Sequence, residues 1–283
     1  MGRETVRRSS PRALAVLACI VWCDACGGHS STGDGSTGNG GTLILQAFGG
    51  PSGTVAAQVP IVEAGVGPQN ICAAPLDAGA CRLTSCQVGG IGSPAAGYGN
   101  FGPISASVGT TTVAITYGGF GYGTVYFPSS ITLGAGDIMK FHGGNGAGVP
   151  TFDVSAVIPG LGVITSPAPR TDGSAVIVDA SQDLSVTWSP ISIGQVHFRL
   201  YDGFSSVGGV AVSLTCTFDG ASGSGVVPQT LLSVMKDMSG ANPTYAGLSS
   251  ELEATTLVDG LTIVTQSFQN TAITIRDFDV TLQ

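Results

Sequence analysis

The stretch Asp-Leu-Ser-Val-Thr-Trp at residues 183–188 alternates polar and apolar side chains. Leu184, Val186 and Trp188 alternate strictly with polar residues, which is the two-residue period of a strand with one buried face. Trp188 is the largest residue on that face, so we expect it to anchor a core and not to contact a ligand. The sequence therefore predicts a strand at 183–188 that faces the interior of a β-sandwich.

Short apolar or alternating runs, separated by Gly, Pro, Asn and Asp, continue this pattern along the chain in both directions. They predict an all-β protein with a β-sandwich or jelly-roll-like fold. The runs lie at 42–48, 54–62, 111–117, 124–127, 137–142, 151–158, 175–178, 195–201, 209–218, 261–268 and 278–282.

One short helix is predicted near 228–236, because Pro228 suits a helix start and no glycine interrupts the residues that follow. Leu231, Val234 and Met235 would share its buried face. We predict one β-sandwich domain at 42–283. A subdivision near 166–171, where two prolines interrupt strand pairing, is the alternative.

The composition excludes several classes of protein. Hydrophobic residues make up 43% of the 283 residues and charged residues 10%, which does not fit disorder, and 44 glycines do not fit a helical bundle. After Cys26 the chain keeps six basic residues against sixteen acidic ones. Phosphate binding needs clustered Lys and Arg, so no nucleic acid is expected as a partner.

The first 41 residues have the order of an export signal. A basic segment with four arginines between Arg3 and Arg12 precedes an apolar stretch at 13–22, which is too short to span a bilayer. Cys26 follows the small residue Ala25 and precedes a Gly/Ser-rich segment. This resembles a bacterial lipoprotein signal, which implies a signal peptide at 1–25, lipidation of Cys26 and a tether at 26–41. The expected location is the outer membrane or the cell surface, with the lipid anchor as the membrane contact.

Four cysteines follow the tether: Cys72, Cys81, Cys86 and Cys216. An even number in an exported chain predicts two disulfides, and four cysteines allow three pairings. We favour Cys72–Cys81 with Cys86–Cys216. The spacing does not match a zinc site, so neither a metal nor another cofactor is expected.

Other polar residues could carry chemistry, but each has a simpler structural explanation, and no catalytic residue is assigned. No serine has the Gly-x-Ser-x-Gly context of a nucleophile elbow. Acids two residues apart commonly lie on a solvent face, and Asp-Gly is first of all a turn signal. The residues considered are His142, His197, Ser224, Glu251 with Glu253, Asp277 with Asp279, and Asp172, Asp202 and Asp219 as calcium ligands.

Tyr117, Phe120, Tyr122 and Tyr126 are interleaved with glycines. Glycine neighbours leave aromatic rings uncovered, and such rings can stack on sugar faces, as they do in carbohydrate-binding modules. The alternative is that the rings cover a sheet edge while the glycines form the turn. These four residues are the candidate ligand-binding residues.

The chain resembles the uncharacterised Gly-rich secreted lipoproteins of Gram-negative soil bacteria. The resemblance rests on the Cys-Gly-Gly start of the tether at Cys26, on the residues from 183 to Pro190, and on 214–218 leading into 225–228. It implies no activity. We therefore expect an envelope-anchored β-sandwich with a structural or ligand-binding role towards a glycan or an envelope protein. A secreted hydrolase, or its carbohydrate-binding accessory, is the alternative.

Overall fold

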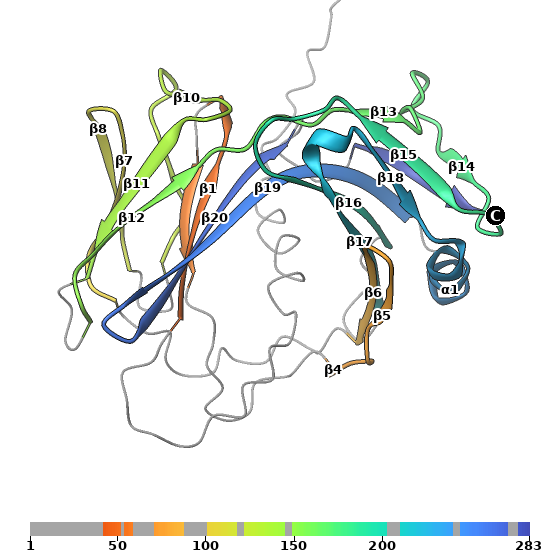
Figure 1. Ribbon diagram of the computed structural model, residues 1–283, viewed down its shortest axis with the longest axis horizontal. Coiled ribbons are helices and arrows are strands. Elements are labelled where there is room, and N and C mark those ends of the chain that lie inside the picture. Colours follow the sequence, from red (N-terminus) through yellow and green to blue (C-terminus); the bar gives the residue numbers. More distant parts are fainter. Residues whose placement is uncertain are drawn as a thin grey trace, which may run out of the picture. The chain divides into compact units, whose positions relative to one another are not determined.

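A computed structural model describes residues 42–51, 54–58, 71–87, 101–117, 122–144, 149–202, 210–239, 244–270 and 277–283 (Figure 1). These residues confirm the all-β sandwich class, with strands arranged in face-to-face sheets and one α-helix among the described residues. The predicted export signal and tether lie outside the described residues, so their assignment stays a prediction.

The first half of the described chain contains strands β1 (Thr42–Phe48), β2 (Gly50–Pro51), β3 (Thr54–Gln58), β4 (Ile71–Cys72), β5 (Leu76–Ala78), β6 (Cys81–Gln87), β7 (Ile104–Val108), β8 (Thr111–Ile115), β9 (Val125–Tyr126), β10 (Thr132–Leu133), β11 (Ile138–Gly143) and β12 (Phe152–Val157). The second half contains β13 (Ile164–Ser166), β14 (Val176–Val178), β15 (Leu184–Trp188), β16 (Gln195–Asp202), β17 (Val210–Asp219), a short 3-10 turn (Gly220–Ser222), β18 (Ser224–Val227), α1 (Gln229–Ser239), β19 (Thr244–Val258), β20 (Leu261–Asn270) and β21 (Phe278–Leu282).

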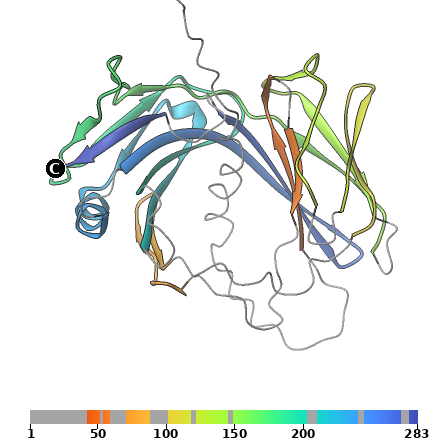
Figure 2. The same ribbon diagram turned by 180° about the vertical axis from the view of Figure 1, so that it is seen from behind.

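One long sheet organises the fold. Its strands follow the order β4-β6-β17-β16-β19-β20-β1-β3-β9, with β5 beside β6 and with β21 joining β14 to β19. A four-stranded sheet (β12-β11-β7-β8) and a three-stranded sheet (β13-β15-β18) complete two sandwiches. Figures 1 and 2 show β19, in blue, as the strand that runs from one sandwich to the other, paired with β20 in the first and with β16 in the second.

Both hydrophobic cores lie on the same face of the long sheet. The first core joins Leu43 and Leu45 of β1 and Ile263 of β20 to the four-stranded sheet. The second core joins Phe198 of β16 and Leu248 of β19 to the three-stranded sheet and α1. The cross-strand registers through β19, β20 and β1 keep these residues on one side, because opposite partners in a sheet share a face. The other side of the long sheet, which we call the outer face, therefore faces away from both cores.

Trp188 anchors the second core, as predicted. Only 3% of its surface is exposed, and Val186 on the same face of β15 is fully buried. The Trp188 Nε1–H donates to the carbonyl oxygen of Gly220 at 3.0 Å, and the indole stacks on Phe218 with ring centroids 5.5 Å apart. A Cβ atom at Gly225 would lie 2.5 Å from the Phe218 ring, so this close packing requires glycine there.

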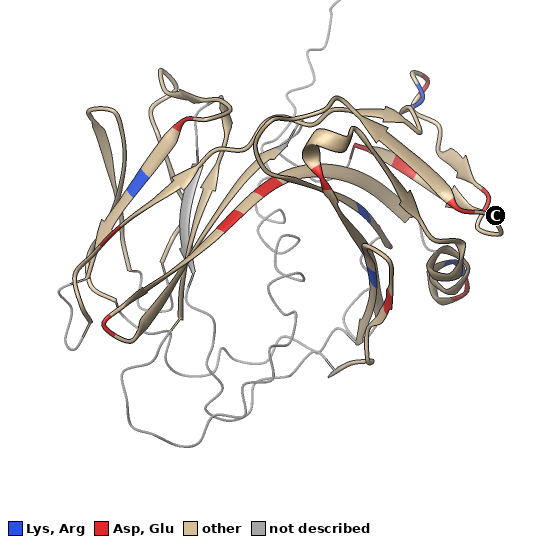
Figure 3. Cartoon of the chain, viewed as in Figure 1, with Lys and Arg blue, Asp and Glu red and all other residues tan. Residues whose placement is uncertain are grey.

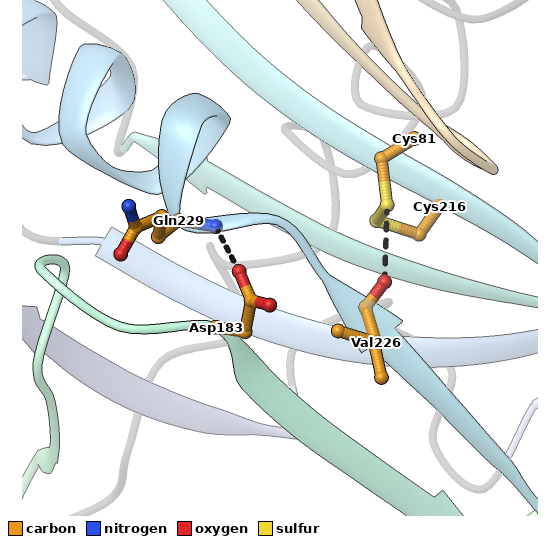
Figure 4. The surroundings of a disulfide bond; sticks show 5 residues. All are labelled: Cys81, Asp183, Cys216, Val226 and Gln229. Atoms are coloured by element: carbon orange, nitrogen blue, oxygen red, sulfur yellow. Dashed lines mark hydrogen bonds between the residues drawn. A yellow bond between two sulfur atoms is a disulfide. The ribbon is translucent and has the colours of Figure 1, made fainter.

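The predicted helix is confirmed as α1. The backbone N–H of Gln229, at its first residue, donates to the Asp183 carboxylate at 2.8 Å, which satisfies a donor that has no partner within the helix (Figure 4). Leu232 is fully buried beside Leu231 and Met235, whereas the prediction placed Val234 on that face; Val234 is partly buried against the same core. Among the described residues, no helix is long and apolar enough to cross a membrane.

The two disulfides are confirmed, but the favoured pairing was wrong. The bonds join Cys72 to Cys86 and Cys81 to Cys216. Each bond links residues directly opposite each other, in the β4–β6 and β6–β17 registers respectively. Cys81 and Cys86 are five positions apart on β6, so their side chains point to opposite faces. Cys81 thus meets Cys216 in the second core, where its sulfur lies 3.8 Å from the carbonyl oxygen of Val226 (Figure 4).

Candidate functional site

The predicted tyrosine segment divides between two environments. Tyr117 and Tyr122 form an isolated β-bridge, and their rings meet edge to face with centroids 5.4 Å apart. The Tyr122 hydroxyl donates to the carbonyl oxygen of Gly102 at 2.5 Å, and its ring packs against the first core. Burial raises the pKa of the Tyr122 phenol. Tyr122 is therefore held by the fold, and Phe120 lies outside the described residues.

Tyr126 belongs to the outer face. It lies on β9 next to Val125, which packs against the first core, so strand alternation directs Tyr126 to the opposite side. Position 54 of β3 is opposite both Tyr126 and Phe48, which places these two aromatic residues in one cross-strand row. The exposed fraction of Tyr126 is 65%, which makes it the most accessible of the candidate residues that the structure describes.

The row continues inwards through two stacked rings. Phe48 of β1 is directly opposite Phe268 of β20, and their rings are nearly parallel, 20° apart in orientation, with centroids separated by 5.2 Å. Phe268 is buried and Phe48 is half-buried. The aromatic row therefore runs from a buried ring at Phe268 to an exposed one at Tyr126.

A row of amides and a carboxylate lies beside the aromatic row. Gln46 of β1 is opposite Gln266 of β20, which is opposite Glu253 of β19. The Gln46 Nε2 donates to the Gln266 Oε1 at 3.0 Å, and the Gln266 Nε2 donates to the Glu253 Oε2 at 3.0 Å. These bonds orient the two amide planes. Gln46 is buried, with 4% of its surface exposed, whereas Gln266 is half-buried and Glu253 is exposed.

A charged cluster follows further along β19. The Glu251 Oε2 lies 3.4 Å from the His197 Nε2 and 3.8 Å from the Arg199 Nη2, and these three side chains are only 10–15% exposed. Ser249 lies next to this cluster, with 1% of its surface exposed, and its Oγ has no hydrogen-bond partner among the described residues. Beyond the cluster, the rings of Tyr201 and Tyr245 lie 5.4 Å apart. The outer face thus carries aromatic pairs on both sides of a partly buried ion-pair cluster.

The paired acids weighed as catalytic candidates have structural partners. Glu251 and Glu253 belong to the two outer-face groups just described, and the Asp277 Oδ2 accepts from the Leu248 backbone N–H at 2.8 Å. Asp279 is opposite Tyr245 in the β19–β21 register. None of these acids is assigned a catalytic role.

The acids weighed as calcium ligands bind backbone and hydroxyl groups nearby. The Asp172 Oδ1 accepts from the Ser174 N–H and hydroxyl, and these bonds lower the pKa of Asp172. The Asp202 Oδ1 accepts from the Val212 N–H at 2.7 Å, and the Asp219 Oδ1 accepts from Ala221 at 3.1 Å. Within the described part of the chain, no three metal-binding side chains gather at one point.

His142 lies on the solvent side of the four-stranded sheet. Its Nδ1 is 2.7 Å from the Asp153 Oδ1 on the neighbouring strand, and both side chains are mostly exposed. Ser105 is opposite His142 on the other side, where its hydroxyl donates to the His142 backbone carbonyl at 3.5 Å. The described contacts therefore connect Ser105 to the backbone of His142 and not to its ring.

Sequence reasoning missed most of the outer face. Alternate polar and aromatic positions in 195–201 and 245–253 could have indicated this face. They become one surface only when the strand at 244–258 pairs with its neighbours, and that strand was not predicted. Only after the register of β16, β19, β20 and β1 is known do these positions become neighbours.

Comparisons with known proteins add little to this description. Neither the protein-family models nor the curated proteins gave a match. Among solved structures, the chain is similar to the crystal structure of chicken CNTN1 FN1-FN3 domains, at 12% identity over 78% of this chain and 79% of that chain, with a TM-score of 0.21. The described geometry itself supports one conclusion: the chain is an all-β sandwich protein with two cross-strand disulfides.

Proposed function

We propose that the protein is exported and anchored to the cell envelope by a lipid on Cys26. The order of basic, apolar and cysteine-containing segments at 1–26 supports export. The two disulfides support it independently, because such bonds persist in oxidising compartments outside the cytoplasm. The resemblance to Gly-rich lipoproteins of Gram-negative soil bacteria agrees with this location.

The proposed role is binding of an extended, uncharged glycan. The observation that carries it is the exposed ring of Tyr126 on a β-sandwich surface, because a bare ring offers a flat apolar face to the C–H side of a sugar. Figure 3 shows Lys and Arg residues scattered singly over the described elements, which favours a neutral ligand over a polyanion. An envelope protein as the ligand is the other outcome that the binding test must distinguish.

The anchor is tested by replacing Cys26 with serine in the full-length protein. We expect Cys26→Ser to move the protein from the detergent phase to the aqueous phase in a phase-partition experiment, and to abolish incorporation of a labelled fatty acid. Cys23→Ser is the matched control, because it changes a cysteine three positions away and should leave both readouts unchanged. Retention of Cys26→Ser in the detergent phase with label would refute the anchor.

The binding role is tested with detergent-solubilised full-length protein on an array of neutral polysaccharides and of acidic ones such as polygalacturonate. Binding to one or more neutral polysaccharides supports the proposal. Binding to no polysaccharide, together with capture of a protein from envelope extracts, would replace the glycan with a protein ligand.

A further inference from the structure

We propose that the protein needs a thiol–disulfide isomerase as a folding partner to reach its native bonds. The cysteines of the β-sandwich follow one another as Cys72, Cys81, Cys86 and Cys216, and the bonds join the first to the third and the second to the fourth. Cys81 therefore lies inside the loop that the Cys72–Cys86 bond closes, while its own partner is 135 positions away. This inference rests on the observed pairing and is independent of the proposed anchor and glycan.

The unfolded chain favours the wrong partners for Cys81. Cys72 precedes Cys81 by 9 positions, whereas Cys216 follows it by 135. The probability of closing a flexible loop falls with about the 3/2 power of its length, so Cys81 meets Cys72 about 60 times as often as it meets Cys216. Cys216 is also the last of the four cysteines to be synthesised. Oxidation before folding therefore produces bonds between Cys81 and its near neighbours.

The fold cannot contain a bond between Cys81 and a near neighbour. Cys81 and Cys86 are five residues apart on β6, which is about 17 Å along an extended strand. The Cα atoms of a disulfide lie at most about 7 Å apart. Cys72 is directly opposite Cys86, so it lies at a similar distance from Cys81. A bond from Cys81 to Cys72 or Cys86 would therefore disrupt β6 and the β6–β17 ladder that brings Cys216 to Cys81.

The two native bonds differ in their accessibility to an attacking thiol. Cys72 is exposed and Cys86 is half-buried, so their bond remains accessible in the folded protein. Cys81 and Cys216 are 2% and 0% exposed and belong to the second core. Thiol–disulfide exchange requires the attacking sulfur to reach the bond, so exchange at Cys81 has to end before that core closes. The isomerase therefore acts on the partly folded chain.

The exchange moves a bond without net oxidation. The isomerase thiolate attacks the Cys72 sulfur of a Cys72–Cys81 bond, that bond breaks, and Cys81 leaves as a thiolate that takes up a proton. The Cys86 thiolate then attacks the mixed disulfide at Cys72, which forms Cys72–Cys86 and releases the isomerase thiolate. Cys81 and Cys216 remain as thiols, and a protein disulfide or oxidised glutathione accepts their two electrons and two protons as their bond forms.

The test refolds the full-length chain in detergent, with Cys19, Cys23 and Cys26 replaced by serine so that only the four cysteines of the β-sandwich can pair. The reduced chain is diluted from denaturant into folding buffer with ferricyanide. After removal of this oxidant, the product is incubated with a purified disulfide isomerase in its reduced form. Non-reducing peptide mapping quantifies each bond at both stages. Loop lengths give the native pairing about one seventh of the ferricyanide product, and we expect the isomerase to raise this fraction about fivefold.

A matched variant removes the competing partners. In Cys72→Ser/Cys86→Ser, only Cys81 and Cys216 can pair, so their bond should form with ferricyanide alone and the isomerase should add nothing. An isomerase with its active-site cysteines replaced by serine should leave the wild-type bonds unchanged.

Three results would overturn the proposal. Native bonds in the majority directly after ferricyanide would mean that the fold selects the pairing before oxidation. A native fraction that the reduced isomerase does not raise would mean that exchange does not lead to the fold. An equal gain with the serine-substituted isomerase would mean that thiol exchange is not its contribution. None of these results depends on the anchor or on glycan binding, which stand or fail by their own tests.

Discussion

Replacing Trp188 with alanine is expected to destabilise the fold strongly, because this side chain anchors the second core. Only 3% of the Trp188 surface is exposed. Truncating a buried tryptophan costs about 3–5 kcal/mol, because the transfer free energy of the side chain is lost and a cavity remains. The change also removes the hydrogen bond to Gly220 and the stacking on Phe218. For a domain of this size, a loss of 3–5 kcal/mol lowers the melting temperature by roughly 10 °C.

The assay follows far-ultraviolet circular dichroism during heating of wild type, Trp188→Ala and Trp188→Phe. The phenylalanine variant keeps a ring next to Phe218 but loses the hydrogen bond, so its loss should be intermediate. Leu257→Ala, at a side chain that is 71% exposed, is the control and should change stability by less than about 0.5 kcal/mol.

Fluorescence provides an independent check, because the chain has only two tryptophans, Trp22 and Trp188. In a Trp22→Phe background, the emission of Trp188 should be shifted to the blue and resist quenching by iodide. Emission typical of an exposed indole, or a Trp188→Ala variant that melts within a few degrees of wild type, would refute the assigned register of β15.

Three further predictions follow from single contacts. Gly225→Ala should destabilise the protein by about 1–3 kcal/mol in chemical unfolding, because its Cβ would lie 2.5 Å from Phe218; an unchanged midpoint would mean that the ring can move away. Removing the Cys81–Cys216 bond, which spans 135 residues, should lower the free energy of unfolding by about 5 kcal/mol. Removing the Cys72–Cys86 bond, which spans 14 residues, should lower it by about 3 kcal/mol. Non-reducing peptide mapping that finds any other pairing would contradict both values. Ser181→Ala should raise the pKa of Asp179, which the Ser181 hydrogen bonds lower, as measured by NMR titration of the carboxyl carbon. The pKa of Asp179 is lowered in the folded state, so its ionised carboxylate stabilises the fold above the unfolded pKa near 3.8, and this stabilisation is lost as the pH falls through the folded pKa. A Ser181→Ala variant with an unchanged Asp179 pKa and unchanged acid stability would show that the Ser181 hydrogen bonds do not lower that pKa.

Local patterns were the part of the fold that the sequence could predict. The strand at 183–188 was predicted because its two-residue period is visible in six consecutive residues, and the helix because proline marks its start. The alternation within that strand was sufficient to predict that Trp188 lies in the core. These features depend on neighbours in the chain, which the sequence displays directly.

The disulfide pairing and the outer face depend on register, which no single stretch displays. The favoured pairing joined Cys72 to Cys81, whereas β4 and β6 form an antiparallel pair that brings Cys72 to Cys86. The strand β19 was missed because Gly247 and the buried Ser249 and Ser250 interrupt its apolar alternation. Without β19, the polar positions of β16 and β20 had no common face.

The long strand β19 also constrains when the protein can fold. Residues 244–251 of β19 pair with β16, and residues 249–258 pair with β20. The two sandwiches therefore share three residues of one strand, and they cannot separate without breaking one of the two ladders. The partner of β1 is β20, and the contact between Gln46 and Gln266 spans 220 residues. Neither sandwich can therefore close until synthesis has nearly reached the end of the chain, and a protein delivered across a membrane in extended form would meet this condition by remaining unfolded until its last strands arrive.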